Sequence, residues 1–278
     1  MFGSLNIFMI YYMDEYIDKY DTLDKVIIFI FQTGNGGIGD LVKFFTFLLH
    51  QCIQRDIKLY CANLSQVSKY ITMKYQKMCI DLQTITTRIY HLEELDHLTP
   101  GISYTCDVDV MYPIFPFKQP LPNTDLDFPY DQVFEFSEEV KQNQSIILKP
   151  IGPYTSIHLR LGDRFLETDQ SFVLCYQDER QFDLNIIDSM IRNTPDAIIF
   201  FCDNLLYKQQ IQQTHANVIL TTGEIGHTSL SNTTDKQILD AVTEFYIMTK
   251  SEHIVSCSNS GFPIMASRFH RKPITYLY

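Results

Sequence analysis

The segment Lys25–Asp40, KVIIFIFQTGNGGIGD, contains the pattern that decides the fold. Lys25–Gln32 is a run of β-branched and aromatic residues, as expected for a strand buried on both faces of a parallel sheet. A glycine-rich turn follows, and Asp40 is predicted to be the N-cap of an apolar helix over 41–54. A second short strand is predicted at 57–61. Together these elements form one βαβ unit.

The second half of the chain repeats the alternation of strands and helices. Over Asp235–Lys250, apolar residues recur at intervals of three and four, which predicts a helix with one apolar stripe. Prolines crowd the segment 111–153 and disfavour regular elements there, apart from a strand-like run at 132–136. The other strand-like runs are 155–161, 197–202, 218–221, 253–257 and 274–277.

This alternation predicts an α/β protein of two Rossmann-like domains that face a cleft, with ligands at the carboxyl ends of the strands. A length of 278 residues fits two domains, because a domain averages about 150 residues. We place the boundary near Pro150, so that residues 1–150 form an N-terminal domain and residues 151–278 a C-terminal domain. With 20 Phe, 17 Tyr and no Trp, the core is expected to be aromatic.

Composition limits the partners and the compartment. The 22 basic and 33 acidic residues give a net charge of −11, which argues against a nucleic-acid partner but is compatible with a small anion. Seven scattered cysteines without a C-x-x-C pair are interpreted as buried thiols of a reducing compartment. No apolar run reaches the length of a membrane span, and the start lacks the basic residues of a secretory signal, so we predict a cytoplasmic protein.

Residues suited to bind a ligand follow the predicted strands. Gly34-x-Gly36-x-x-Gly39 has the spelling of a dinucleotide fingerprint between a strand and a helix. The second strand, however, ends at Asn63 without the acid that an NAD ribose requires. Glycines here would let a ligand approach the backbone and the amides at the helix start. A tight turn without a ligand remains the alternative.

The next strand end reads SIHLRLGDRF over 156–165, and alternation places Ser156, His158 and Arg160 on one side. Polar side chains on a buried strand are costly unless they are paired. The planar guanidinium of Arg160 offers two parallel donors and a permanent charge, which suits a phosphate. Taken alone, His158 would be interpreted as a hydrogen-bonded core histidine, but beside Arg160 we favour a functional role.

Two further strand ends carry polar residues. One strand edge presents Asp203 and Asn204; the carboxylate could accept the N–H groups of a guanine edge, but spacing alone favours it as the cap of the following helix. The segment Ser256–Gly261, SCSNSG, would surround an anion with amides and hydroxyls, and a well-capped helix starting near 262–263 is the alternative.

Taken in order, these segments resemble the GDP-fucose-dependent fucosyltransferases of the α1,2, α1,6 and protein O-linked kinds, which have the GT-B fold. Gly34–Asp40 is similar to their N-terminal glycine loop, and HLRLGD over 158–163 to their His-x-Arg-Arg-Gly/Thr-Asp motif. Phe201–Asn204 resembles their strand ending in Ser/Thr-Asp-Asp, and Phe245–Phe262 their last helix, strand and serine turn. Leu161 departs from the pattern, because the α1,2 and α1,6 enzymes usually have a second arginine there.

The resemblance implies that residues 1–150 form the acceptor-side domain and that residues 151–278 bind the nucleotide sugar, and it implies a role for each matching residue. Arg160 would hold the donor diphosphate, and His158 would lie beside it at the phosphate or the sugar. The substrate-binding residues implied in addition are Gly36 and Gly37 under the diphosphate and sugar, Asp203 or Asn204 at the guanine, and Ser258, Ser260 and Gly261 in the phosphate-contacting turn.

The implied reaction is inverting, metal-independent transfer of a deoxyhexose, with L-fucose as the expected sugar, from a GDP-sugar to a glycan hydroxyl. Arg160 and nearby amides would stabilise the charge on the leaving diphosphate, so neither a metal nor a cofactor is implied. Asp107-Val-Asp109 has the spelling of a metal motif but lies outside the second-half cleft.

Glu167 or Asp169, just after the Arg160 strand, would accept the proton of the acceptor hydroxyl, unless they are simply solvated loop carboxylates. Two other functions remain open. The glycine fingerprint fits a nucleotide-cofactor oxidoreductase, and the departure at Leu161 fits a non-catalytic nucleotide- or sugar-binding module.

Overall fold

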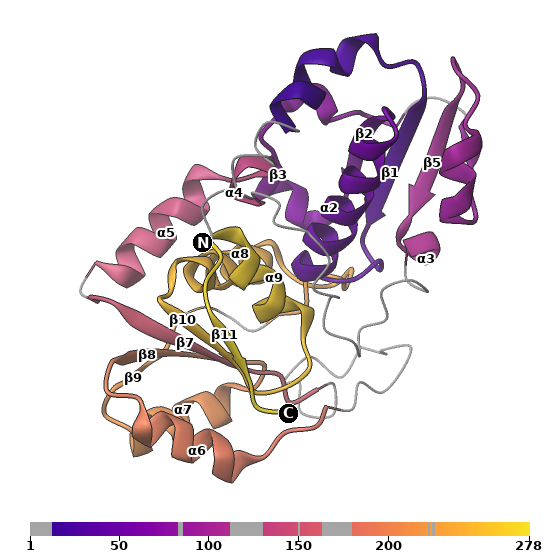
Figure 1. The fold of residues 1–278 in the computed structure, drawn as a ribbon. Coiled ribbons are helices and arrows are strands. Elements are labelled where there is room, and N and C mark those ends of the chain that lie inside the picture. Colours follow the sequence, from indigo (N-terminus) through magenta and orange to yellow (C-terminus); the bar gives the residue numbers. More distant parts are fainter. Residues whose placement is uncertain are drawn as a thin grey trace, which may run out of the picture.

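The computed structural model describes residues 13–82, 86–111, 130–149, 151–162, 180–221, 223 and 226–278. It contains two parallel sheets with helices packed against them, which confirms the predicted α/β class (Figure 1). The first sheet has the order β2-β1-β5-β4. Its strands are β1 (Val26–Gln32), β2 (Lys58–Leu64), β4 (Thr87–Arg88) and β5 (Ser103–Asp107).

The predicted βαβ unit is confirmed as β1, helix α2 (Ile38–Gln54) and β2, with β1 and β2 parallel. The helix starts earlier than predicted, and Asp40 is not its N-cap. Gly37 is the N-cap, with extended backbone, and Asp40 lies in the first turn, where its Oδ2 accepts a hydrogen bond of 2.9 Å from the Gly37 amide. Gly37 keeps an extended backbone up to the start of the helix. Asp40, in the first turn, stabilises that start by accepting the Gly37 amide and by placing a negative charge near the positive helix end.

The second sheet has the order β11-β10-β7-β8-β9, with all neighbours parallel. All five strands lie within the predicted runs or within one residue of them, and α8 has the predicted bounds. The elements are β7 (Tyr154–Leu159), α6 (Leu184–Asn193), β8 (Ala197–Cys202), α7 (Leu205–Thr214), β9 (Val218–Ile219), α8 (Asp235–Lys250), β10 (His253–Ser256), α9 (Gly261–Phe269) and β11 (Ile274–Tyr276).

Several short elements lie outside the two parallel sheets. The predicted strand at 132–136 is confined to β6 (Phe134–Phe136), which pairs antiparallel with β3 (Ile71–Met73). Further α-helices are α3 (Val108–Met111), α4 (Tyr130–Val133) and α5 (Glu138–Leu148), which packs on α8, and residues 13–19 are helical as well. The 3-10 helices are η1 (Tyr20–Thr22), η2 (Gln66–Lys69), η3 (Gln76–Met78) and η4 (Leu92–His97). Pro150 lies outside the described residues, and the division at this point stays a prediction.

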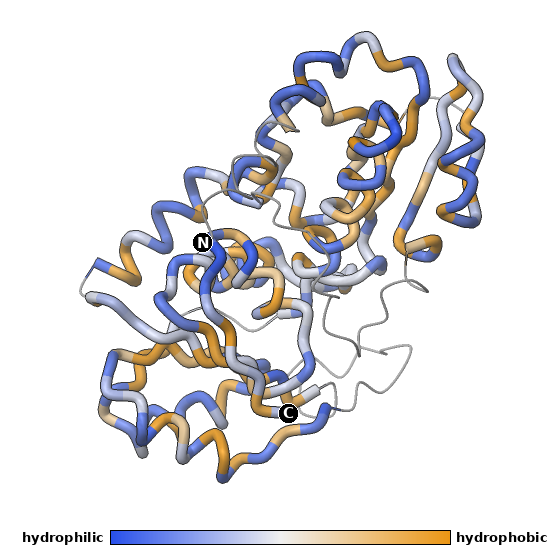
Figure 2. The backbone as a smooth tube through the Cα atoms, in the orientation of Figure 1, coloured by the Kyte–Doolittle hydropathy of each residue, from blue (hydrophilic) through white to orange (hydrophobic). Residues whose placement is uncertain are grey.

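One apolar cluster joins both sheets, and it is aromatic. Phe45 of α2 contacts Phe134, with ring centroids 5.7 Å apart, and Phe134 contacts Phe269 of α9 at 6.0 Å. Alternate residues of β8 serve two cores, since Ile199 and Phe201 belong to this cluster while Ile198 and Phe200 pack in a second cluster with α6 and α7. In Figure 2 the hydrophobic colouring is concentrated along the strands, between the helices.

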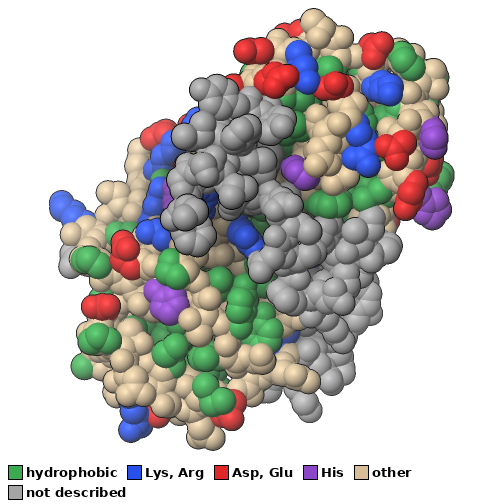
Figure 3. All heavy atoms as spheres, viewed as in Figure 1, with side chains coloured by type: hydrophobic (Ala, Val, Ile, Leu, Met, Phe, Trp, Pro, Cys, Tyr) green, Lys and Arg blue, Asp and Glu red, His purple; other side chains and the backbone are tan. Residues whose placement is uncertain are grey.

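The positions of the charged side chains and of the cysteines can be compared with what the composition predicted. Lys, Arg, Asp and Glu are interspersed over both lobes on the face shown in Figure 3. Of the described cysteines, Cys79 is exposed, which corrects the expectation that all are buried; Cys175 lies outside the described residues. Among the described helices, none combines the length and the apolar character needed to cross a bilayer.

Helices α2 and α9 meet through glycine backbones at their first turns. A methyl group placed on Gly39 would lie 2.9 Å from the carbonyl carbon of Gly261. Real Cβ atoms do not approach backbone so closely, so only glycine at position 39 permits this spacing. The start of the first helix is thereby held against the start of the last one.

We predict that Gly39→Ala destabilises the protein by about 1–3 kcal/mol, because the added methyl group must separate two packed helices. Gly152→Ala is the matched control, since a methyl group there meets nothing within 4 Å. Urea unfolding followed by circular dichroism measures both variants. Equal midpoints for the two variants would contradict the close contact.

Candidate functional site

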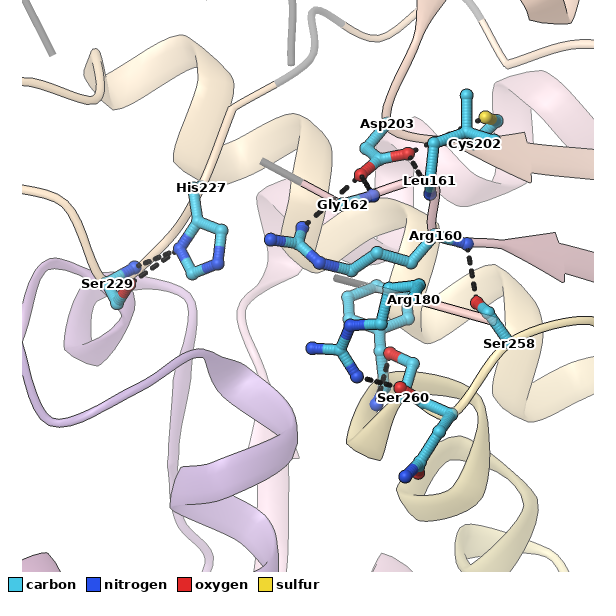
Figure 4. Close-up of polar contacts among 12 residues, drawn as sticks. Arg160, Leu161, Gly162, Arg180, Cys202, Asp203, His227, Ser229, Ser258 and Ser260 are labelled. Atoms are coloured by element: carbon cyan, nitrogen blue, oxygen red, sulfur yellow. Dashed lines mark hydrogen bonds and ion pairs between the residues drawn. The ribbon is translucent and has the colours of Figure 1, made fainter. Parts of the chain in front are cut away.

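The ends of β7 and β8 and the start of α9 meet at one edge of the second sheet (Figure 4). Hydrogen bonds hold the serine turn against β7: the Cys257 amide donates to the His158 carbonyl at 2.8 Å, and the Arg160 amide donates to Ser258 Oγ at 2.9 Å. Because neighbouring parallel strands end at the same edge, residues from distant segments are brought together.

Asp203, at the end of β8, organises the turn after Arg160. Its Oδ1 accepts from the Leu161 amide at 2.8 Å and its Oδ2 from the Gly162 amide at 3.1 Å. Nη1 of Arg160 lies 3.7 Å from the same Oδ2, which is an ion-pair distance but too long for a hydrogen bond. The Asp203 carboxylate therefore fixes the backbone of the two residues that follow Arg160.

Asn204 caps α7, since its Oδ1 accepts from the Tyr207 amide at 2.8 Å. The prediction that the Asp203 carboxylate caps this helix is therefore wrong: the next residue, Asn204, has that role, and Asp203 bonds across to the turn after β7. Recognition of guanine by either residue stays a prediction. Leu161 is buried in the second apolar cluster, so the position where the resembling enzymes usually have an arginine serves the core here.

Two guanidinium groups approach the start of α9. Arg160 projects from the end of β7, and its side chain is only 15% exposed. Arg180 precedes α6 and donates from Nη1 to the carbonyl oxygen of Asn259, in the serine turn. Figure 4 shows the Arg180 side chain beside Ser260, while the Arg160 side chain extends past Asp203 toward the side of His227. Arg180 lies in no motif of the sequence that would mark it.

His158 lies between these charges. Its ring stacks on Phe262 with centroids 5.4 Å apart, and its buried Nδ1 has no hydrogen-bond partner among the described residues. Burial, with the nearby charges of Arg160 and Arg180, lowers the pKa of His158 from 6.5 to about 3. The ring is therefore neutral at physiological pH, and it is not the fully hydrogen-bonded core histidine of the alternative interpretation.

The serine turn leads into α9 as predicted, one residue earlier than expected. Ser260 is the N-cap, and its Oγ accepts from the Phe262 amide at 3.4 Å. Ser256 Oγ donates to the Ser258 carbonyl at 2.9 Å, and all three serines are buried. Pro263 has no N–H and the Phe262 amide is taken by Ser260, so the Gly261 amide and the positive helix end are what the first turn of α9 offers an anion near the two arginines.

The glycine turn lies against a second loop. Gly36 has φ +121°, and a methyl group there would lie 2.5 Å from Asp40 Oδ2, so this position requires glycine. A methyl group on Gly37 would approach Thr228 Oγ1 to 3.1 Å. The loop that carries Thr228 therefore closes over the turn.

His227 precedes Thr228 and faces the side of Arg160 in Figure 4. Its Nδ1 lies 3.3 Å from the Ser229 amide, which donates to it, and 2.6 Å from Ser229 Oγ. An amide that donates to Nδ1 selects the tautomer with hydrogen on Nε2. No motif in the sequence marked His227, because the loop has no regular pattern.

The other residues that the sequence singled out either lie away from this site or fall outside the described residues. Asp107 and Asp109 pair with Arg88 at 2.9 and 3.4 Å, at the edge of the first sheet. Within the part of the chain that the structure describes, no group of three or more His, Cys, Asp or Glu side chains could hold a metal ion. Glu167 and Asp169 lie outside the described residues.

Comparison by sequence finds no match among protein-family models or curated proteins. Solved structures do match. A variant of FUT1 from Arabidopsis thaliana in complex with GDP has a TM-score of 0.54 and 11% identity, covering 96% of this chain and 75% of that one. POFUT1 in complex with GDP-fucose has a TM-score of 0.54 and 10% identity, covering 91% of this chain and 98% of that one. Fucosyltransferase NodZ from Bradyrhizobium has a TM-score of 0.54 and 9% identity, covering 87% of this chain and 92% of that one.

These likenesses extend over most of each chain, and they show that the protein has the GT-B fold of these fucosyltransferase structures. The predicted architecture of two Rossmann-like units is thereby confirmed.

We predict that the His158 ring stays neutral in the folded protein down to about pH 4, because its pKa is lowered to about 3. In the unfolded chain the same ring gains a proton below its ordinary pKa of 6.5, so the free energy of unfolding falls as the pH drops through that value, by at most about 1.4 kcal/mol per pH unit. Imidazole chemical shifts measured by NMR report the ionisation. A titration midpoint near 6.5 would contradict the burial of this ring.

Proposed function

We propose that this protein is a glycosyltransferase that transfers a deoxyhexose, with L-fucose as the expected sugar, from a GDP-linked donor to a glycan hydroxyl. The observation that carries the proposal is the convergence of Arg160, Arg180 and the start of α9 at one edge of the second sheet. This anion site belongs to a fold whose matching solved structures include complexes with GDP and GDP-fucose.

The diphosphate of the donor would bind at this edge. Ser258 and Ser260 supply hydroxyl groups, the Gly261 amide at the start of α9 supplies a backbone donor, and the two guanidiniums supply permanent positive charge. Gly36 and Gly37 would lie on the facing turn, under the diphosphate and the sugar. Gly261 leaves the backbone at the start of α9 accessible, since a methyl group there would meet only Asp40 Oδ1, at 4.0 Å.

Arginine is suited to the chemistry that the donor requires. When the bond between the anomeric carbon and the diphosphate breaks, negative charge accumulates on the phosphate oxygen, and preorganised donors stabilise that charge without reorganisation. We propose that the guanidiniums take the part that a divalent cation has in other transferases, and that the reaction needs neither a metal nor a cofactor. Attack by the acceptor on the opposite face would invert the anomeric configuration.

His158 would contribute as a neutral group. With its pKa lowered to about 3, it adds no charge beside the diphosphate, and its Nδ1 can exchange a hydrogen bond with a phosphate or sugar oxygen. Asp203 would act through Arg160 by holding the turn that follows it. Glu167 or Asp169 remains our proposal for the base that takes the acceptor proton.

We predict that Arg160→Ala weakens GDP binding by about 2–5 kcal/mol, roughly 30-fold or more, because it removes a largely buried charge from the phosphate site. Arg192→Ala is the control, since Arg192 is exposed on α6, where it pairs with Asp188 one helical turn before it. Isothermal titration calorimetry with GDP measures both. NAD, titrated in parallel, tests the oxidoreductase alternative, and unchanged GDP affinity in Arg160→Ala would refute the site.

We also predict that the purified protein slowly hydrolyses GDP-fucose to GDP and fucose, with water in place of the acceptor, and that excess EDTA does not reduce the rate. The physical reason is that Arg160 and Arg180 remain after any divalent ion has been removed. GDP release is followed by chromatography. Binding without turnover would favour the non-catalytic module, and loss of turnover in EDTA would contradict the metal-independent mechanism.

A further inference from the structure

Asp40 is a buried acid that neither the sequence analysis nor the proposed mechanism uses as a ligand-binding group. It is only 8% exposed, and one of its oxygens, Oδ2, accepts the Gly37 amide. The other oxygen, Oδ1, is buried and has no hydrogen-bond partner among the described residues. A buried carboxyl oxygen without a partner is costly, so its retention calls for an explanation.

The position of Oδ1 suggests what that partner is. A methyl group placed on Gly261, the first residue of α9, would lie 4.0 Å from Oδ1. Asp40 follows Gly39, whose backbone packs on Gly261, so the carboxyl is held at the start of α9 by the contact that joins the two helices. Oδ1 therefore borders the place where the Gly261 amide and the positive end of α9 would bind an anion.

The charged groups around Asp40 come from several elements. Lys43 follows it on α2, Arg160 comes from the end of β7 and Arg180 from the segment before α6, and each of these cations lowers the pKa of the acid. Desolvation outweighs them and raises the pKa from 3.8 to about 6. The other titratable groups of the site are His158, neutral through its pKa of about 3, and Asp203, which is engaged by the β7 turn.

We propose that Asp40 takes up a proton from solvent when a nucleotide diphosphate binds, and donates a hydrogen bond from Oδ1 to a phosphate oxygen at the start of α9. This inference rests on the proposed function. It gives the unpartnered oxygen a partner, and it leaves Oδ2 free to keep accepting the Gly37 amide.

The alternative, an ionised Asp40 beside a diphosphate, would bring like charges together in a buried site. A nearby anion disfavours the charged form of a carboxyl group, so the pKa of Asp40 rises further in the complex. Protonation costs little, because burial has already raised the pKa to about 6 in the free protein. The same neutral acid would strengthen its hydrogen bond as charge accumulates on the leaving diphosphate.

Proton uptake by Asp40 determines how the affinity for the nucleotide changes with pH. The complex binds one proton more than the free protein at pH values between the free and the bound pKa of Asp40. Affinity is therefore highest below pH 6 and falls as the pH rises, by up to about tenfold per unit, until the bound pKa is passed. GDP-fucose is the suitable probe, because its diphosphate is esterified at both ends and does not titrate near neutral pH.

Calorimetry of GDP-fucose binding between about pH 6 and pH 8, in two buffers of different ionisation enthalpy, measures both affinity and proton uptake. We expect uptake and a falling affinity in the wild-type protein. In Asp40→Asn, whose amide donates without titrating, we expect no uptake and a nearly constant affinity. Asp96→Asn, an exposed acid paired with Arg55, is the control and should behave as wild type.

Equal pH dependence in wild type and Asp40→Asn, or an affinity that rises with pH, would overturn this role. If Asp40→Asn does not fold, carboxyl carbon NMR of the wild-type protein decides: the pKa of Asp40 must rise when GDP-fucose is added, and an unchanged or lowered pKa overturns the inference. Tight binding without linked protonation would refute only the role of Asp40. Failure of the wild-type protein to bind GDP or GDP-fucose would refute the proposed function as well.

Discussion

The close approach of Gly39 to Gly261 is the contact on which the candidate site depends. It joins the first turns of α2 and α9, and these helices follow β1 of one sheet and β10 of the other. Helix starts carry unpaired amides and a positive dipole end, so bringing two of them together concentrates anion-binding capacity in a small volume. An aromatic core that continues from Phe45 through Phe134 to Phe269 supports this contact from behind.

The charged side chains of the site bond to backbone groups as well as to one another. Asp203 bonds mainly to the amides of Leu161 and Gly162, and its ion pair with Arg160 is long. Arg180 bonds to a backbone carbonyl of the serine turn. Arg180 is thus held at the turn that leads into α9, and Arg160 lies beside Asp203, where a permanent charge on a planar group suits a diphosphate. Burial keeps His158 neutral and raises the pKa of Asp40, so neither group opposes that charge strongly.

Sequence reasoning predicted the strands that carry the site and the order of the motifs along them. It placed His158 and Arg160 at the end of a buried strand and the serine turn before a helix, and both placements are confirmed. It assigned the N-cap of α2 to Asp40, because acids are common caps, whereas Gly37 has that role. It also favoured the Asp203 carboxylate as the cap of α7, whereas the next residue, Asn204, has that role, since only coordinates show where each side chain points.

By itself, the sequence determined the α/β class, the βαβ unit and the residues that end each strand, because hydrophobic periodicity and glycine are local signals. Only the tertiary structure decided that Arg180, His227 and Asp40 lie near Arg160. These residues belong to segments far apart in the chain, and their meeting follows from the packing of α2 on α9 and the pairing of β7 with β8 and β10. Burial is likewise a property of the assembled fold, and so are the pKa values that burial shifts.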